Sequence, residues 1–378
     1  MDYGLSTRMQ SAVEEFAPTT PPTHSNTANV IDLSTAQNEV LRPELVEFFK
    51  STVEDKATGN VCTRLLGVVF ALPPGNGGDP QDRAALATFF NTYFNPIHAV
   101  KPEHVVLTAG TSDAIERVVH AVCEEGDSVL VPGPMWHGFS PMLRTRANVN
   151  IITASPPTYD NWDNYLAASL QAVYDFSAEK SRIKAVLLCN PHNPFSRCYP
   201  KKVLLEVMEF CQEHGLHLIV DEIYALTDLN SKVKGAAPFV SALSLTEPLV
   251  PEGAVKIDPS RVHVVWSASK LFGMSGFRIR LSAAYSLLAA MLTKHAIEFI
   301  APSHGLFLFA RLGKHASTAA EEKVCFEALE REGVRVGEGR FYRGVEGKFG
   351  WARVSFSLGP DVMREGMGRL DRFLEKRG

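Results

Sequence analysis

Lys270 is the residue whose position most needs a chemical explanation. It follows a β-rich run within "VVWSASKLFGMSGFRIR", the segment from Val264 to Arg280. An unpaired ammonium is costly at the end of a buried strand, so this amine needs a partner or a covalent role. Buried lysines with a lowered pKa form Schiff bases with carbonyl compounds and act as bases.

Asp221 raises the same question, because this carboxylate ends an apolar run and is followed three residues later by Tyr224 in "HLIVDEIYAL". A carboxylate at the end of a buried strand needs a partner. Capping a following helix is the competing role. The sequence leaves both roles open.

Two more segments place an aromatic or amide side chain after a β-rich run. Trp136 follows "SVLVPGP", where it could stack on a flat ring or serve as a core aromatic. Asn193 lies in "NPHNPFSRCY", where Asn-Pro pairs favour turns that can aim an amide into a crevice. Such a turn can also be structural only.

Small residues open the helical pattern after "HVVLT", where Gly110, Thr111 and Ser112 begin "GTSDAIERVV". Backbone N–H groups, two hydroxyls and the helix dipole would together form an anion site suited to phosphate. A capped turn between a strand and a helix explains these residues equally well.

One ligand accounts for all of these positions together. Pyridoxal phosphate needs an anion cradle, an aromatic to stack on its ring and a donor to its phenolic oxygen. It also needs a carboxylate opposite its pyridine nitrogen and a lysine for the Schiff base. The joint fit therefore predicts a pyridoxal-phosphate site.

The elements that would position these residues alternate along residues 104–285. Short β-rich runs are separated by amphipathic helices; the runs are "HVVLTAG", "SVLVPGP", "VNIITAS", "KAVLLCNP", "LHLIVDEI" and "RVHVVWSAS". Continuous apolar strands that alternate with helices predict a mostly parallel sheet covered on both faces. Ligands of such sheets bind beyond the carboxyl ends of the strands, where the candidate residues lie.

The chain of 378 residues is expected to hold a large domain and a smaller one. Residues 1–30 are rich in Thr, Pro, Ser and Asn, which predicts a mobile arm. Residues 31–285 would form the large α/β domain, with 31–50 packing on the small domain. Residues 286–378 would form that small α+β domain.

Composition excludes several classes of partner. A hydrophobic fraction of 45% and a charged fraction of 21% are typical of a soluble globular protein. The net charge of −4 gives no basic footprint for nucleic acid or an anionic membrane. The chain shows no signal-like start and no long apolar stretch, so we expect a cytoplasmic protein. Six scattered cysteines without ligand spacing predict inert thiols and no metal site.

The order of these motifs resembles that of class I/II aminotransferases of fold type I. The segments are "LTAGTSDAIE", "VPGPMWHGF", "NPHNPFSRCY", "IVDEIYA", "SASKLFGMSGFRIR" and "WARVSFS". Within that family, "IDLSTAQNEVLRPEL" and "VKPEHVVLTAGTSDAIE" are most similar to the fungal branch related to 1-aminocyclopropane-1-carboxylate synthase. The resemblance implies a homodimeric, pyridoxal-phosphate-dependent enzyme that deprotonates an α-amino acid and acts as an aminotransferase or a lyase.

The resemblance also implies roles for the candidate residues. Lys270 would hold the cofactor and, once displaced, remove the Cα proton, while Asp221 would pair with the ring nitrogen. Asn193 and Tyr224 would hydrogen-bond the phenolic oxygen, and Trp136 would stack on the ring. The phosphate ligands would be Gly110, Thr111, Ser112, Ser267, Ser269 and Arg278. The substrate would contact Arg353, which would grip its carboxylate, together with Asn193, Ala36 and Gln37.

Three features differ from the family pattern. The early loop "VVFALPPGNGGDP" has no tyrosine to reach a neighbouring subunit's phosphate, and Phe70 or Asn76 falls near that place. Gln37 stands where the cyclopropane-forming synthases have a glutamate, and it cannot act as a base. The interval between Arg278 and "GLFLFARL" is several dozen residues shorter than expected.

Two alternatives belong to other functional classes. A non-catalytic relative could keep the fold as a binding or regulatory scaffold; the shortened region favours this and the retained site residues oppose it. A generic nucleotide-binding protein is a poor fit, because neither G-x-G-x-x-G nor G-x-x-x-x-G-K-[ST] is present.

Overall fold

The computed structural model describes residues 29–36, 77–230, 233–245, 258–271 and 278–377, with side chains from Ser282 onward in the last range. A few isolated residues nearer the N-terminus are also described: Gln10, Glu14, Glu15, Glu44, Glu47, Lys50 and Ser51. The predictions for Gln37, Phe70, Asn76 and nearly all of the arm over residues 1–30 lie outside the described residues.

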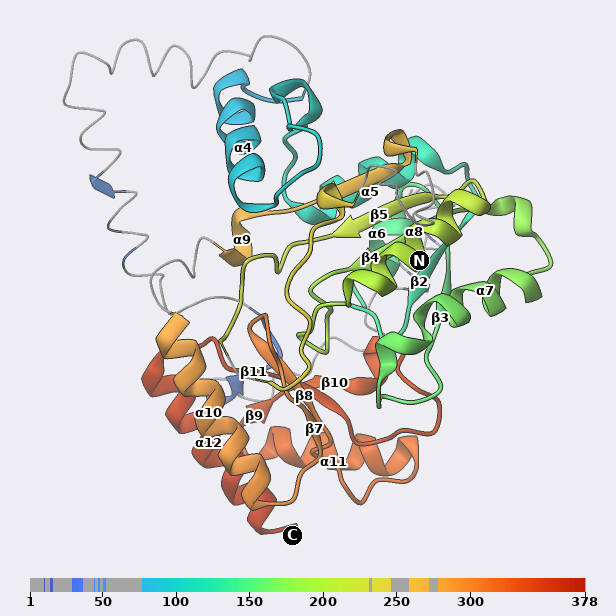
Figure 1. The fold of residues 1–378 in the computed structure, drawn as a ribbon. Helices are drawn as coiled ribbons and strands as arrows, with labels where there is room; N and C mark the ends of the chain where they lie inside the picture. The colour runs from blue at the N-terminus through green and yellow to red at the C-terminus, as the bar shows by residue number, and fades with distance from the viewer. Residues whose placement is uncertain are drawn as a thin grey trace.

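The larger part of the molecule is built on a five-stranded sheet (Figure 1). Its strands are β2 (Ser128–Pro132), β3 (Asn150–Ala154), β4 (Ile183–Cys189), β5 (His217–Asp221) and β6 (Val262–Val265). They lie in the order β3-β2-β4-β5-β6, and every neighbouring pair is parallel. The predicted parallel sheet is therefore confirmed, and all five carboxyl ends meet at one edge.

Helices cover both faces of this sheet because its strands are apolar on both sides. On one face, α5 (Thr111–Val122) and α6 (Phe139–Thr145) pack with alternate strand residues such as Val129, Leu187 and Ile219. On the other face, α7 (Leu166–Phe176) and α8 (Lys201–Glu213) pack with the intervening residues, among them Leu130, Leu188 and Val220. The two-residue period of the strands thus divides the core into two layers.

The segment "HVVLTAG" was predicted to be a strand, and this is wrong. No strand is assigned between residues 105 and 110, and Val106 is 66% exposed. Among the described residues, its backbone N–H groups bond within the turn before it, as from Val105 N to Pro102 O at 3.1 Å, and to Gly77 O from Leu107 N at 2.8 Å, and they form no strand ladder. The segment still leads directly into the start of α5.

The smaller part has an antiparallel sheet in the order β10-β11-β8-β7. Its strands are β7 (Phe299–Ile300), β8 (Phe307–Ala310), β10 (Gly337–Glu338) and β11 (Ala352–Ser355), and its helices are α11 (Ala319–Arg331) and α12 (Pro360–Glu375). Near the start of the chain, β1 (Ile31–Asp32) pairs in parallel with β9 (Val334–Arg335). The N-terminal strand is therefore attached to the smaller part.

Helix α10 (Arg278–Lys294) connects the two parts and packs against α12 (Figure 1). The expected domain boundary between residues 285 and 286 falls inside this helix. The other helices that lie wholly within residues 77–377 of the described ranges are α4 (Pro80–Tyr93), α9 (Ala268–Leu271) and the 3₁₀ turns Pro102–His104, Trp162–Tyr165, Lys180–Arg182, Ala242–Ser244, Pro259–Arg261 and Gly339–Tyr342.

Two further observations concern the chemistry of the whole chain. The five cysteines that the structure describes are all buried and free. Burial raises the pKa of their thiols, to about 12 for Cys123, as expected for unreactive cysteines. Within the described ranges, no helix combines the length and apolar character needed to cross a bilayer.

Candidate active site

Asp221 ends β5, and its carboxylate is only 3% exposed. Its Oδ1 accepts a hydrogen bond of 3.1 Å from the backbone N–H of Ile223. A turn follows β5, not a helix, so the helix-capping role does not apply. Burial raises the pKa of Asp221 to about 7, against the opposing effects of the Ile223 N–H and of Lys270. A buried carboxylate of this kind is suited to a cationic ligand.

Lys270 lies in α9, five residues after the end of β6. Its Nζ donates a hydrogen bond of 2.6 Å to the backbone carbonyl of Ala36. Burial lowers the pKa of Lys270, and the charge of Arg353 lowers it further, while Asp221 opposes the shift. The direction matches the sequence-based expectation, and it favours a neutral amine.

Arg353 lies in β11 with 5% of its surface exposed. Its Nη1 donates to Asn193 Oδ1 at 3.0 Å, and its Nη2 donates to the Ser34 carbonyl at 2.6 Å. The guanidinium lies 4.6 Å from the ring centre of Phe307 and 5.4 Å from that of Tyr342. Its Nε is buried without a hydrogen-bond partner, so the fixed guanidinium retains donor capacity for a carboxylate.

Asn193 and Tyr224 complete this group, and each is 4% exposed. The Tyr224 ring packs edge-on against Phe307 at 5.3 Å between centroids. Burial raises the pKa of Tyr224, and the charge of Arg353 opposes that shift. A neutral phenol is a hydrogen-bond donor. Because Asn193 Oδ1 is engaged by Arg353, its amide N–H₂ is left as the donor.

The start of α5 has the backbone geometry of an anion cradle. Gly110 precedes the helix with φ of +99°, and a Cβ built on it would meet no atom within 4 Å. The Thr111 hydroxyl is buried and has no hydrogen-bond partner, whereas Ser112 is exposed. An unpartnered buried hydroxyl beside free helix N–H groups fits a phosphate.

Ser267 and Ser269 lie between β6 and Lys270. Their hydroxyl oxygens are 2.8 Å apart, and the Ser269 N–H donates to Ser267 Oγ at 3.1 Å. Helix α5 packs against β6, the strand that these serines follow, and against the neighbouring β5. Arg278 begins α10, but its side chain lies outside the described residues.

Trp136 follows β2 and is half-buried at the same edge of the sheet. Its ring packs edge-on against Phe139 at 5.6 Å. A Cβ at Gly138 would lie 2.5 Å from the ring, so the close approach of the indole requires glycine there. Phe139 and Gly138 thus fix the position of the Trp136 indole from one side.

Some residues at this site carry no signal in the sequence. The carbonyl groups of Ser34 and Ala36 contact Arg353 and Lys270 through backbone atoms, although Ala36 itself was predicted to line the site. Tyr342, buried against Arg353, lies in no recognisable motif. The pairing of β1 with β9 and the hydrogen bond from Ser355 N to Leu33 O bring the early segment to the site.

Comparison with known proteins identifies the class to which this fold and site belong. The model of the family "Aminotransferase class I and II" matches residues 28–282. The chain belongs to this family. Its members depend on pyridoxal phosphate and act on amino acids, so the predicted class, cofactor and type of substrate are confirmed.

Individual relatives include fungal and plant proteins. The chain is 32% identical over 432 residues to the "Probable aminotransferase aclI" of Aspergillus oryzae, covering 99% of this chain and 98% of that protein. It is 30% identical over 349 residues to "1-aminocyclopropane-1-carboxylate synthase 3" of Oryza sativa, covering 89% and 75%. The aromatic aminotransferase structure from Pyrococcus horikoshii has a TM-score of 0.73 at 18% identity, covering 98% and 99%. This last comparison supports the fold.

Proposed function

We propose that the chain is an aminotransferase whose site is formed by Lys270, Asp221 and Arg353. The observation that carries the proposal is the meeting of the Lys270 amine and the Arg353 guanidinium beneath the segment Ser34–Ala36. Pyridoxal phosphate, when bound, supplies an electron sink for the charge left on the substrate Cα. The protein must hold the reacting groups and move the proton.

Lys270 would carry the proton. A neutral amine can accept the Cα proton, and both burial and the charge of Arg353 favour the neutral form. The amine must leave the Ala36 carbonyl, 2.6 Å away, before it can take that proton. Because the amine is free only once the amino acid is bound, the pH profile of kcat should rise with pH through the lowered pKa of Lys270.

Asp221 would act through its negative charge. Its carboxylate is fully enclosed, and its pKa of about 7 reflects a cost of ionisation that a nearby cation would remove. A protonated pyridine nitrogen is such a cation. Its pairing with Asp221 would keep the ring protonated and thus able to accept electrons.

Arg353 and Asn193 would orient the substrate. A guanidinium held by Asn193 and by the Ser34 carbonyl can bind a carboxylate in a fixed plane. The Asn193 amide and the Tyr224 hydroxyl would donate to the phenolic oxygen of the cofactor. The remaining contacts would be to phosphate and are assigned to Gly110, Thr111, Ser112, Ser267, Ser269 and Arg278.

A lyase of the cyclopropane-forming type is the second candidate. The relationship to a plant synthase at 30% identity favours it, and Gln37 opposes it because an amide cannot serve as a base.

The alignment to the Aspergillus oryzae protein spans 432 positions, more than the 378 residues of this chain. The relative thus has segments that this chain lacks.

Two further proposals concern assembly and location, the first resting on the family and the second on the sequence. The protein would form a homodimer with each site near the subunit boundary, and it would act in the cytoplasm. Light scattering of the purified protein tests the first proposal, and a monomer would count against it. Imaging of the tagged chain in its own cells tests the second.

The decisive experiment locates the cofactor. The purified protein is incubated with pyridoxal phosphate, reduced with borohydride and digested, and the modified residue is identified by mass spectrometry. Modification at Lys270, absent in Lys270→Ala and retained in the exposed-site variant Lys348→Ala, is expected. An unmodified Lys270 would refute the proposal. An amino-acid screen for keto acid, ammonia or thiol release then separates transamination from elimination.

A further inference from the structure

A second pocket lies in the small part of the molecule. Its volume is about 380 Å³, within the range of about 300–1,000 Å³ typical of small-molecule sites. It is lined by the loop after α10, the loop after β8, the start of α11 and the end of α12. None of the residues assigned to the active site lines it.

The distance between the two sites follows from α10. Helix α10 has 17 residues, which corresponds to a length of about 25 Å. Lys270 lies before its first residue, whereas His295 and Ile297 of the pocket follow its last. Figure 1 shows the lower ends of α10 and α12 near the C-terminus, with α9 beyond the other end of α10. The pocket is thus separate from the active site.

The floor of the pocket is apolar. Ile297, Leu312, Cys325 and Leu374 line it, and each is at most 6% exposed. Val324, also in the lining, is 56% exposed, which is unusual for a large apolar side chain beside a cavity. An apolar ligand body would remove this surface from water.

The rim of the pocket carries an excess of positive charge. Lys314 and Arg377 line it together with His315, and the one carboxylate in the lining is Glu321. Glu321 is engaged at the start of α11, where it accepts from the N–H and the hydroxyl of Ser317, both at 2.8 Å. Its single negative charge offsets only one of the two cations, so the lining keeps a net positive charge.

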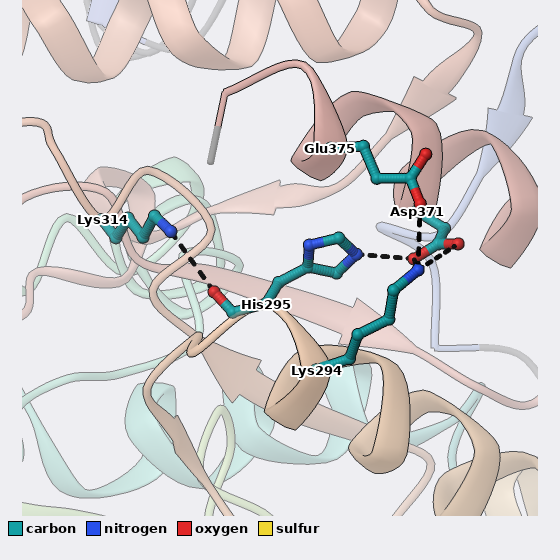
Figure 2. Close-up of polar contacts among 5 residues, drawn as sticks. All are labelled: Lys294, His295, Lys314, Asp371 and Glu375. Carbon is teal, nitrogen blue, oxygen red and sulfur yellow. Dashed lines mark hydrogen bonds and ion pairs between the residues drawn. The ribbon is translucent and has the colours of Figure 1, made fainter.

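Two carboxylates of α12 beside Lys294 and His295 are also engaged (Figure 2). Asp371 accepts from His295 Nε2 at 2.6 Å and from Lys294 Nζ at 3.1 Å, and Glu375 accepts from Lys294 Nζ at 3.0 Å. The Lys294 ammonium thus already holds the carboxylates that could otherwise join His295 in binding a metal ion. Asp371 and Glu375 therefore pair with Lys294 and His295, and not with Lys314 or Arg377.

Lys314 and Arg377 consequently lack anionic partners among the described residues. Lys314 Nζ donates only to the His295 carbonyl, at 3.3 Å (Figure 2). Arg377 lies over the Phe373 ring at 5.2 Å and hydrogen-bonds the Cys325 thiol. Two cations over an apolar floor, with no carboxylate partner among the described residues, match a ligand that brings one.

We propose that this pocket is a second small-molecule site that binds a monocarboxylic acid with an apolar body, such as an aryl-alkyl carboxylate. The apolar body lies against Leu312, Leu374 and Val324. The carboxylate lies between Lys314 and Arg377.

The test measures binding of 4-(4-fluorophenyl)butyrate to the full chain loaded with pyridoxal phosphate, by ¹⁹F NMR. Saturable binding is expected for the acid, and much weaker binding for its uncharged amide. Lys314→Ala and Arg377→Ala should each weaken binding about tenfold, the loss of one charge-assisted contact. Ala320→Trp, at an exposed position in the lining, should abolish binding by filling the pocket. Lys323→Ala, an exposed lysine on α11 outside the lining, is the matched control.

The active site also attracts carboxylates, so one variant separates the two sites. Arg353→Ala should leave binding of the fluorinated acid unchanged. Binding that persists in Ala320→Trp and disappears in Arg353→Ala would place the acid in the active site and overturn the proposal. Equal binding of the acid and its amide, or no saturable binding, would also overturn it.

Discussion

Arg353 and Asn193, 160 positions apart in the chain, are joined by a hydrogen bond of 3.0 Å between Nη1 and Oδ1. The bond connects β11 of the small sheet to the turn that follows β4 of the large sheet. It joins the residue assigned to the substrate carboxylate to the one assigned to the phenolic oxygen of the cofactor. The two binding tasks are therefore mechanically coupled.

Arg353→Lys should damage substrate binding more than its conserved charge suggests. A lysine cannot contact Asn193, the Ser34 carbonyl and a carboxylate together, because it lacks the planar fork of donors. We expect kcat/KM for the amino acid to fall about 100-fold, equivalent to about 3 kcal/mol. Steady-state kinetics measure this, with the exposed Arg343→Lys as the control. Near-normal kcat/KM in Arg353→Lys would remove the carboxylate role.

Asp221→Asn should separate cofactor binding from catalysis. The amide keeps the shape of the side chain but cannot hold a positive charge on the ring nitrogen. We expect kcat to fall about 1,000-fold, the size of a lost electrostatic contact in a buried site, while pyridoxal phosphate remains attached to Lys270. Asp228→Asn, at an exposed carboxylate after the same strand, should retain activity. An active Asp221→Asn protein would exclude the charge-pairing role.

His192→Phe should change how stability depends on pH. His192 stacks on Phe195 with ring centres 4.7 Å apart, and its Nδ1 accepts the Phe195 N–H at 3.4 Å. Burial lowers the pKa of His192 to about 3, against a hydrogen bond to the Pro134 backbone that opposes the shift. The neutral ring is favoured in the folded state. Its contribution is complete above pH 6.5 and is lost as pH falls from there towards 3.

The measurement compares the free energies of unfolding of parent and variant in urea. For each pH unit below 6.5, the free energy of unfolding of the parent should fall by about 1.4 kcal/mol, and that of the variant should not show this loss. When the pH falls from 7.5 to 5.0, the free energy of unfolding of His192→Phe relative to that of the parent should therefore rise by about 2 kcal/mol. The exposed His120→Gln serves as the control. A difference that stays constant with pH would contradict the prediction.

Gly138→Ala should loosen the cofactor site by moving Trp136. The added Cβ would lie 2.5 Å from the indole ring, so the ring must shift. Loss of a well-placed aromatic contact, about 1.4 kcal/mol, should weaken pyridoxal-phosphate affinity about tenfold. Fluorescence titration of the apoenzyme measures this. Gly359→Ala, where a Cβ meets nothing within 4 Å, should bind normally, and unchanged affinity in Gly138→Ala would argue against stacking on Trp136.

The sequence predicted the sheet because a buried parallel strand leaves a local mark: a short apolar run followed by a helix. The strand prediction for "HVVLTAG" was wrong because an apolar run forms a strand only if another strand pairs with it, and Val106 instead faces solvent. Pairing partners are a property of the whole fold. They are not visible in five residues.

The residues of the site likewise divide into those with a local signal in the sequence and those whose role depends on the whole fold. Lys270 and Asp221 stood out because charged side chains at the ends of apolar runs need a reason, whereas Arg353 was assigned from the resemblance of "WARVSFS" to the family. The carbonyls of Ser34 and Ala36 did not stand out, since every residue has a carbonyl and only the fold determines which one meets a lysine 234 positions away. Tyr342 was missed for a similar reason, because its role depends on packing against Arg353.

The segment from Ile31 to Ala36 is held almost entirely by the smaller part of the molecule. Leu33 N donates to Arg335 O at 2.7 Å, and Ser355 N donates to Leu33 O at 2.8 Å. Lys270, whose amine contacts Ala36, belongs to the end of the large sheet. The Arg353–Asn193 bond crosses between the same two parts. The backbone carbonyl of Ala36 therefore ties the position of the Lys270 amine to the placement of the smaller part.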